Sequence, residues 1–440
     1  MNRLLRNIFF TLAVLLVAYS AAFANYLHAD GHSVVHSTII RAALLSAIVL
    51  ALAGWRFSLK NKFKIFAVLA GLLLVEIVLQ AAAWSGVLPA MNTEIKAPFA
   101  RVYWTQEGHG NSIRNRFGWH YPVFDLKAAH KIAYIGDSEV AAVEVSPDQN
   151  QAADLQKLLK EKSPDWAVLG LGNRGSCLAH SIDMLEYAWR HFQPQEAIIA
   201  VSMGANVAET SPKLINHPAA VYIYYDLDPG GQLVLNPASA RFRAWFDNNL
   251  ELSHRSLLFN LPVILNSHCM IMQMIESLHD TLALRKIKEH VIVHHNGVQG
   301  NGFNPAPFAV DRSPEAQRAM KILLAQLQQC KNVCDSHGMK FRVVTIPSFP
   351  TIFYDTQHGR DWTMHIGDYD YFGPEREVVN WAQTNGVPIV SMGEYIEREK
   401  MDVAEIRGLY FSNGTGHLTE KGHALLARQI YENFYRKSAP

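Results

Sequence analysis

The stretch Lys131-Ile132-Ala133-Tyr134-Ile135-Gly136-Asp137-Ser138 decides the fold of this chain. It is a short apolar run that ends in glycine and two polar residues, a pattern typical of a buried strand followed by a turn. Similar runs recur along the chain, at residues 166–171, 196–202, 341–346 and 387–391. Because these runs do not alternate between apolar and polar residues, they suit a parallel sheet that is covered on both faces.

Helical patterns lie between and after these runs, at residues 151–160, 177–190, 314–336, 374–384 and 420–436. Strands that alternate with helices imply right-handed crossovers. The fold class that we predict is therefore α/β, a doubly wound parallel sheet in a three-layer α/β/α domain. In such a domain, the loops at the carboxyl ends of the strands form the binding crevice.

One long insertion, residues 207–313, interrupts this alternation. We expect it to form either a cap over the crevice or a peripheral packing subdomain, and its composition does not separate the two. Its apolar run at residues 257–265 is broken by Asn260 and Pro262, so we do not expect it to span a membrane.

Much of the apolar composition lies in the first 90 residues of the 440-residue chain. Residues 7–27 carry no charge, residues 65–88 carry only Glu76, and residues 34–55 carry only Arg41. Each stretch is long enough to cross a hydrocarbon core, which needs about 20 residues. We therefore predict a membrane anchor of two or three transmembrane helices in residues 1–90, followed by the α/β domain in residues 91–440.

The positively charged residues indicate an orientation. Arg3 and Arg6 precede the first apolar stretch, residues 25–37 contain no lysine or arginine, and residues 56–64 contain four. The positive-inside rule then places the N-terminus in the cytoplasm and, with three spans, everything after Leu88 outside it. Cleavage of a signal peptide after Ala22-Phe23-Ala24 is the alternative, and it leaves two spans and the same location for the large domain.

Charge and cysteine content predict few partners. Forty basic residues against 39 acidic ones give no basic field for nucleic acid, and the cysteines and histidines show no spacing of a structural zinc site. We predict neither a metal nor a cofactor. Within the third apolar stretch, Glu76 and Gln80 share one helix face, and they indicate either a polar contact with a membrane partner or a carboxylate tolerated within the helix packing.

Four residues predict the chemistry. Ser138 follows the first strand, Gly172 ends the second, Asn206 follows the third, and His417 precedes the last helix. A serine hydroxyl needs an imidazole to take its proton and hydrogen-bond donors to hold the oxyanion that forms. We expect Ser138 and His417 to be nucleophile and base, with Gly172, Asn206 and the Ser138 N–H holding the oxyanion.

This order of motifs resembles the SGNH, or GDSL, hydrolase superfamily, over about residues 111–434. The superfamily's four blocks supply Ser in GDS, a Gly, an Asn in GxND and a His in DxxH, which match Ser138, Gly172, Asn206 and His417 in turn. The resemblance implies a flavodoxin-like, SGNH-type domain and a serine esterase chemistry.

Two positions depart from the superfamily pattern. Val207 stands where GxND has its aspartate, and Gly414 stands where the catalytic acid usually lies, three residues before His417. The acid is therefore unknown from sequence. Three interpretations stay open: a Ser-His dyad helped by a backbone carbonyl, an inactive site, or an acid from another loop, for which the candidates are Asp361, Asp368 and Asp370.

The resemblance also implies a substrate class. Extracytoplasmic, membrane-tethered members are esterases or O-acetyltransferases of bacterial cell-surface polysaccharides, so we expect a multi-pass protein of the bacterial inner membrane with its C-terminal domain in the periplasm or outside the cell. The expected partners are the membrane, a carbohydrate or acylated glycan, and a membrane protein that donates the acyl group. A non-catalytic module of a polysaccharide modification or export complex, and a lipid esterase or thioesterase, are the alternatives.

Overall fold

The computed structural model describes residues 2–29, 38–85, 96–105, 107–215, 222–275, 306–347, 370, 372–411 and 416–436. Its contacts divide the chain into two compact units. The first contains Met1–Tyr103, Arg116–Gly118 and Asn248–Asn296, and the second contains Trp104–Asn115, Trp119–Asp247 and Gly297–Pro440.

The first unit is built on three long helices, α1 (Asn2–Ala29), α2 (Thr38–Arg56) and α3 (Leu59–Trp84). Each is long and apolar enough to cross a membrane, which confirms the expected number of apolar helices. The most apolar stretch of α3 has no buried residue, so its leucine, valine and isoleucine side chains face outwards, as they do on helices that lie in lipid.

The rest of the first unit comes from the region that we expected to be a single insertion. Helix α9 (Ala240–Leu252) leads into α10 (Leu257–His268), which packs against α1. Residues 248–275 therefore group with the N-terminal helices rather than with the sheet, because their apolar side chains share a core with α1 and α2. Strand β1 (Arg101–Trp104) begins in this unit.

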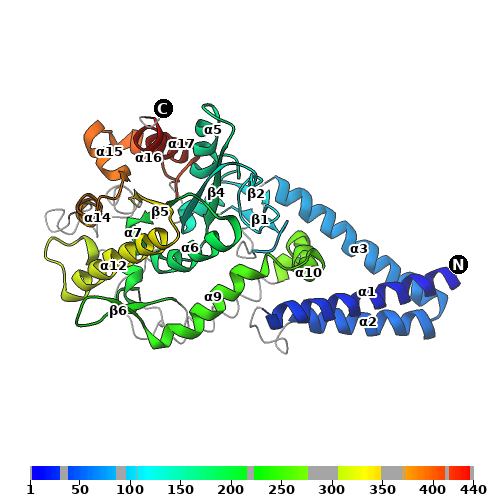
Figure 1. Cartoon of the computed structure of the whole chain (residues 1–440). Coiled ribbons are helices and arrows are strands. Elements are labelled where there is room, and N and C mark those ends of the chain that lie inside the picture. Colours follow the sequence, from blue (N-terminus) through cyan, green and yellow to red (C-terminus); the bar gives the residue numbers. More distant parts are fainter. Residues whose placement is uncertain are drawn as a thin grey trace. The chain divides into compact units, whose positions relative to one another are not determined.

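The second unit contains the predicted parallel sheet. Its strands are β3 (His130–Gly136), β4 (Trp166–Gly172), β5 (Glu196–Ser202), β8 (Lys340–Ile346) and β9 (Ile389–Ser391), in the spatial order β4-β3-β5-β8-β9. All neighbouring pairs are parallel. Numbered along the chain, the order is 2-1-3-4-5, the flavodoxin-like doubly wound arrangement. The predicted fold class is confirmed (Figure 1).

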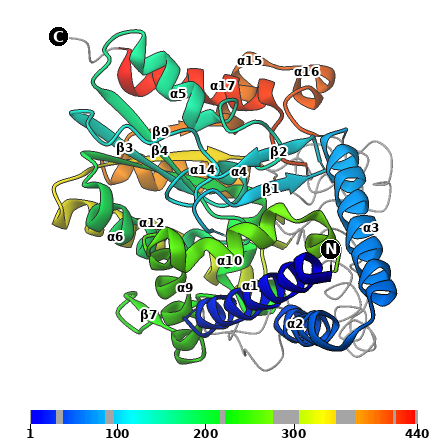
Figure 2. The same cartoon turned by 90° about the vertical axis from the view of Figure 1, so that its right-hand side faces the viewer.

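Helices cover both faces of this sheet. Helix α5 (Gln151–Lys160) packs against α17 (Glu420–Ile430) on one face, and α6 (Leu178–Phe192) packs against α12 (Pro314–Ser336) on the other (Figure 2). Helix α14 (Gly373–Thr384) contacts β9. Because both faces are covered, β5 is buried along its whole length, as its unalternated sequence requires.

Shorter elements complete the second unit. A β-hairpin of β6 (Tyr225–Leu227) and β7 (Leu233–Leu235) turns at the Asp228-Pro-Gly-Gly stretch of the insertion. The remaining short elements are β2 (Gly110–Ile113), α4 (Ser138–Ala141), α7 (Met203–Asn206), α8 (Pro212–Ile215), α15 (Met392–Glu399) and α16 (Val403–Arg407). The expected cap role of the insertion stays a prediction.

Candidate active site

Ser138 is the first residue of α4, directly after the carboxyl end of β3. The Asp137 side chain caps this helix by accepting the Glu139 N–H at 3.0 Å, and the helix ends after one turn because Ala142 adopts a left-handed conformation. Backbone N–H groups in the first turn of a helix have no acceptor within the helix. The Ser138 N–H is therefore suited to bind an anion beside its own hydroxyl.

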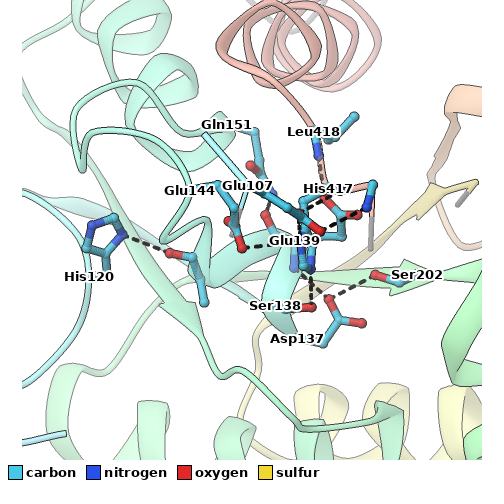
Figure 3. Close-up of polar contacts among 12 residues, drawn as sticks. Glu107, His120, Asp137, Ser138, Glu139, Glu144, Gln151, Ser202, His417 and Leu418 are labelled. Atoms are coloured by element: carbon cyan, nitrogen blue, oxygen red, sulfur yellow. Dashed lines mark hydrogen bonds and ion pairs between the residues drawn. The ribbon is translucent and has the colours of Figure 1, made fainter. Parts of the chain in front are cut away.

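His417 contacts the hydroxyl of this serine, as we expected. Its Nε2 is 2.9 Å from the Ser138 Oγ, although 279 positions separate the two residues in sequence. The His417 side chain is 10% exposed, so little water competes for this contact. The structure thus brings the predicted nucleophile and base within hydrogen-bonding distance (Figure 3).

The carboxylate behind His417 belongs to Glu107, a residue that we did not predict. Its Oε2 is 2.5 Å from Nδ1 of His417, and the two carboxylate oxygens accept the N–H groups of Gly416 and His417 at 3.0 and 3.2 Å. A carboxylate at Nδ1 holds the tautomer that leaves Nε2 free to accept the serine proton. The Ser-His dyad with a backbone carbonyl is therefore wrong.

None of the residues that we considered for the acid is seen to contact His417 in the described part of the chain. Asp370 forms an ion pair with Arg376, to which both of its carboxylate oxygens are bonded. Asp361, Asp368 and Gly414 lie outside the described residues. Glu107 instead comes from the segment between β1 and β2, 310 positions before the histidine.

Two further buried carboxyl groups face the imidazole (Figure 3). Glu144 Oε1 lies 3.2 Å from Nδ1, and Glu139 accepts the N–H of Leu418 at 3.2 Å. Burial raises the pKa of Glu139 to about 8, and burial also raises the pKa of Glu144. In both groups burial favours the uncharged carboxyl, and the charge of the nearby His417 opposes this effect.

These carboxyl groups also change the base. Burial by itself lowers the pKa of His417, but Glu144, Glu107 and Glu139 outweigh this effect and raise the pKa to about 10. The site thus stabilises an imidazolium strongly, which is the form that the base takes after it accepts a proton from a serine.

Two of these carboxyl groups and the imidazole raise the question of a metal. Among the described residues, the ligand atoms of Glu107, Glu144 and His417 lie within 4.8 Å of one another, close enough to hold an ion. An ion bound to Nδ1 would replace the proton that Glu107 accepts. A metal at this position and a Ser-His-Glu arrangement therefore exclude each other.

Asn206 is joined to the serine loop through Asp137. Its Nδ2 lies 2.9 Å from Asp137 Oδ2 and 3.3 Å from Glu209 Oε2, and the Ser202 hydroxyl donates to Asp137 Oδ1 at 2.9 Å. The aspartate of the GDS motif therefore ties the ends of β3 and β5 together. Both amide protons of Asn206 have acceptors here, so an oxyanion would have to displace the longer bond to Glu209.

Gly172 has a packing role that we did not predict. A Cβ atom at this position would lie 1.9 Å from the Ala141 nitrogen and 2.2 Å from the Val140 carbonyl carbon. The main chain of α4 fills the space on the Cβ side of this glycine, and the expected role of the Gly172 N–H in holding the oxyanion stays a prediction. Glycine is needed because only it lets α4 cross the end of β4 this closely.

Neighbouring aromatic and histidine side chains are structural. Trp104, Trp119 and Tyr121 are buried and belong to the core. His423 is completely buried, and burial and the nearby His417 lower the pKa of its imidazole to about 3. It belongs to the packing of α17 rather than to the reacting groups.

The sequence held one unused signal for the acidic residues of the site. Glu144 stands within the run Ala141-Ala142-Val143-Glu144-Val145, where an isolated carboxylate among apolar residues is unusual. Glu107 gives no comparable signal, because it lies in a polar stretch between two short strands.

Comparisons with known proteins give fold-level likenesses alone. No family model matches the chain, and no curated protein matches it. A lipolytic protein of the G-D-S-L family from Desulfitobacterium hafniense DCB-2 has a TM-score of 0.34 and 9% identity, over 69% of this chain and 99% of that one.

Two further solved structures have similar values. TesA has a TM-score of 0.33 and 12% identity, over 70% of this chain and 98% of that one. The acetyl xylan esterase AlAXEase has a TM-score of 0.31 and 12% identity, over 69% of this chain and 99% of that one. Because these values are low, the function proposed below rests on the geometry of the chain's own site.

Proposed function

We propose that this protein is a serine esterase in which Ser138, His417 and Glu107 form the catalytic triad. The observation that carries the proposal is the continuous hydrogen-bonded row from Ser138 Oγ through both nitrogens of His417 to the Glu107 carboxylate. Burial of Glu107 and His417 keeps water from competing with these bonds. The arrangement is the general solution for making a serine hydroxyl nucleophilic.

The reaction follows from these contacts. Ser138 Oγ attacks the carbonyl carbon of an ester while its proton passes to Nε2 of His417, and Glu107 stabilises the imidazolium. The Ser138 N–H, and the Asn206 amide in place of its bond to Glu209, hold the oxyanion. The imidazolium then gives its proton to the departing alkoxide, which leaves an acyl group on Ser138.

The second half of the reaction determines the class of enzyme. His417 takes a proton from an incoming hydroxyl, whose oxygen attacks the acyl carbon, and then returns that proton to Ser138 Oγ as the ester bond to the serine breaks. Water as the incoming group gives an esterase, and a sugar hydroxyl gives an O-acetyltransferase. We propose acetyl esters of cell-surface polysaccharide as the substrates, since the four sequence blocks resemble the SGNH superfamily, whose extracytoplasmic, membrane-tethered members are esterases or O-acetyltransferases of such polysaccharides.

The membrane location is part of the same proposal. Three helices of sufficient length and apolarity precede the α/β unit, and the distribution of lysine and arginine favours a cytoplasmic N-terminus. We therefore propose a multi-pass protein of the bacterial inner membrane with its α/β unit in the periplasm. The absence of an acidic residue at position 414 supported the alternative of a non-catalytic module. Because Glu107 contacts His417 in the place of that acid, this argument for the alternative no longer holds.

Acyl-chain preference tests the proposal. The full chain in detergent is expected to release acetate from p-nitrophenyl acetate and from acetylated polysaccharide, and Ser138→Ala is expected to abolish both reactions. Ser146→Ala is the matched control, because this exposed serine lies eight positions from the nucleophile. Faster turnover of long-chain esters would replace the acetyl substrate by a lipid, and no turnover of any ester would contradict the enzyme.

A further inference from the structure

Helix α10 has an inverted distribution of polar and apolar residues. Its outward face carries four leucines, and Leu258 is 76% exposed; the four are Leu257, Leu258, Leu261 and Leu265. Its inward face carries three buried polar residues beside the buried Val263; the three are Asn260, Asn266 and Ser267. A helix whose apolar side chains face water while its polar ones are buried is the reverse of the usual arrangement in soluble proteins. Helices that face lipid have this inverted pattern.

The buried polar residues of α10 are engaged within their own unit. Asn260 Nδ2 donates to the Leu252 carbonyl at 3.2 Å, and the Ser267 hydroxyl accepts the Arg101 N–H at 3.0 Å. Asn260 therefore satisfies the carbonyl of the last residue of α9, and Ser267 satisfies the N–H of the first residue of β1. No comparable contact within the unit accounts for the exposed position of the four leucines among the described residues.

The position of α10 within the first unit is at one end of α1 and α2. Val263 shares an apolar cluster with Phe23 and Tyr26, near the end of α1, and with Ile39 and Ile40, near the start of α2. The rings of Tyr26 and Phe259 lie 5.5 Å apart. Figure 2 shows α10 alongside α1. Helix α10 thus packs on helices that are apolar enough to cross a membrane.

The non-helical break at Cys269, after α10, lies beside a part of α3 that is well before the last residue of that helix. The Glu76 carboxylate accepts the N–H groups of Met270 and Ile271 at 2.8 and 2.9 Å, and Gln80 donates to the His268 carbonyl at 2.7 Å. Glu76 lies eight residues before Trp84, the last residue of α3, or about 12 Å at 1.5 Å per residue.

Non-helical backbone is tolerated at such depth only where the protein itself supplies hydrogen-bonding partners. Glu76 and Gln80 supply them here, and Arg101 donates in turn to the Gln80 oxygen at 2.5 Å. Their contacts within the chain account for the polar residues in the third apolar helix. The membrane partner that the sequence left open is not needed to explain them.

We propose that residues 257–275 form a re-entrant element whose leucine face binds lipid acyl chains, in the leaflet where α1 ends. This inference rests on the membrane location proposed above and adds a fourth contact with the bilayer. We expect it to enter and leave on one side of the membrane, since α10 has only 12 residues, ends at the break at Cys269 and is too short to cross the bilayer.

Spin labels on the full chain in phosphatidylcholine vesicles test the proposal. Single cysteines replace Leu258 and Leu265 in a Cys269→Ser background, because the three other cysteines are buried. Leu73 of α3, 63% exposed, is the control for lipid, and Asn332 of α12, also exposed, is the control for water. Accessibility to oxygen and to a water-soluble nickel chelate is measured at each label.

The expected result is that labels at 258 and 265 collide with oxygen more than with the nickel chelate, as at 73 and unlike at 332. Nickel accessibility at 258 and 265 equal to that at 332 overturns the re-entrant element. Exclusion of both reagents there also overturns it, because a protein surface then covers the leucines. A water-exposed label at 73 overturns the membrane location itself, which separates the two failures.

Discussion

Replacement of Glu107 by glutamine tests the residue that completes the proposed triad. The carboxylate accepts three N–H groups, from His417 Nδ1, the His417 backbone and the Gly416 backbone. Glutamine keeps one acceptor oxygen and places an NH2 group where the second oxygen was. If that NH2 faces Nδ1, the imidazole takes the other tautomer and Nε2 can no longer accept the serine proton.

The expected magnitude follows from this loss. Changing the acid of a serine triad to its amide lowers kcat by about 10,000-fold, which is about 5.4 kcal/mol of barrier at 1.36 kcal/mol per factor of ten. Glu144 lies 3.2 Å from the same nitrogen and can orient the ring in part. We therefore expect Glu107→Gln to lose about 1,000- to 10,000-fold in kcat, since part of the effect is compensated.

The assay is initial-rate hydrolysis of p-nitrophenyl acetate by the full chain, with circular dichroism to show that the variant is folded. Glu144→Gln is the matched control, because it removes the neighbouring carboxylate and leaves Glu107 in place. A folded Glu107→Gln protein within about ten-fold of the wild-type rate would refute the reasoning, since ten-fold corresponds to only about 1.4 kcal/mol. So would a larger loss in Glu144→Gln than in Glu107→Gln.

Three further changes probe the surroundings of the triad. Glu144→Gln removes a carboxylate that raises the pKa of His417. Because only the neutral imidazole accepts the serine proton, the acidic limb of the pH profile of kcat/KM should move to lower pH. An acidic limb at the same pH as in the wild type would contradict this. Asn206→Ala should lower kcat by about 100- to 1,000-fold with little change in KM if its amide holds the oxyanion, whereas a change in KM alone would exclude that role. Gly172→Ala should lower the midpoint of thermal unfolding more than Gly175→Ala does. A Cβ at residue 172 would lie 1.9 Å from backbone, whereas a Cβ at residue 175 would meet no atom. At residue 175 alanine is disfavoured only by the left-handed φ of +68°, which costs about 1 kcal/mol. The reverse order in thermal unfolding would show that α4 adjusts to the added methyl group.

The sheet could be predicted from sequence because burial on both faces leaves a local trace. Each strand, such as β5, is an uninterrupted apolar run, and the helices between the strands show their own period. The position of Ser138 followed from this, since residues at the carboxyl ends of parallel strands gather at one edge of the sheet. His417 precedes the last helix instead, and its role was predicted from the order of the four motifs. That reasoning uses only neighbours in sequence and a known topology.

Glu107 could not be found in this way. It reaches His417 from a segment outside the alternation of strands and helices, so no spacing connects the two residues. Gly172 illustrates a different limit, because a glycine that admits a ligand and one that admits a helix backbone look the same in sequence. The grouping of α10 with the N-terminal helices was missed because Asn260 and Pro262 made its apolar run look unsuited to a membrane.

Covalent labelling of Ser138 tests the central claim most directly. The full chain is treated with a fluorophosphonate, and the modified peptide is identified by mass spectrometry. The triad predicts one label per chain on Ser138, no label in Ser138→Ala, much slower labelling in His417→Ala and unchanged labelling in Ser146→Ala. A folded wild-type protein that takes up no label, or that takes it up on another serine, would contradict the assignment of Ser138 as the nucleophile.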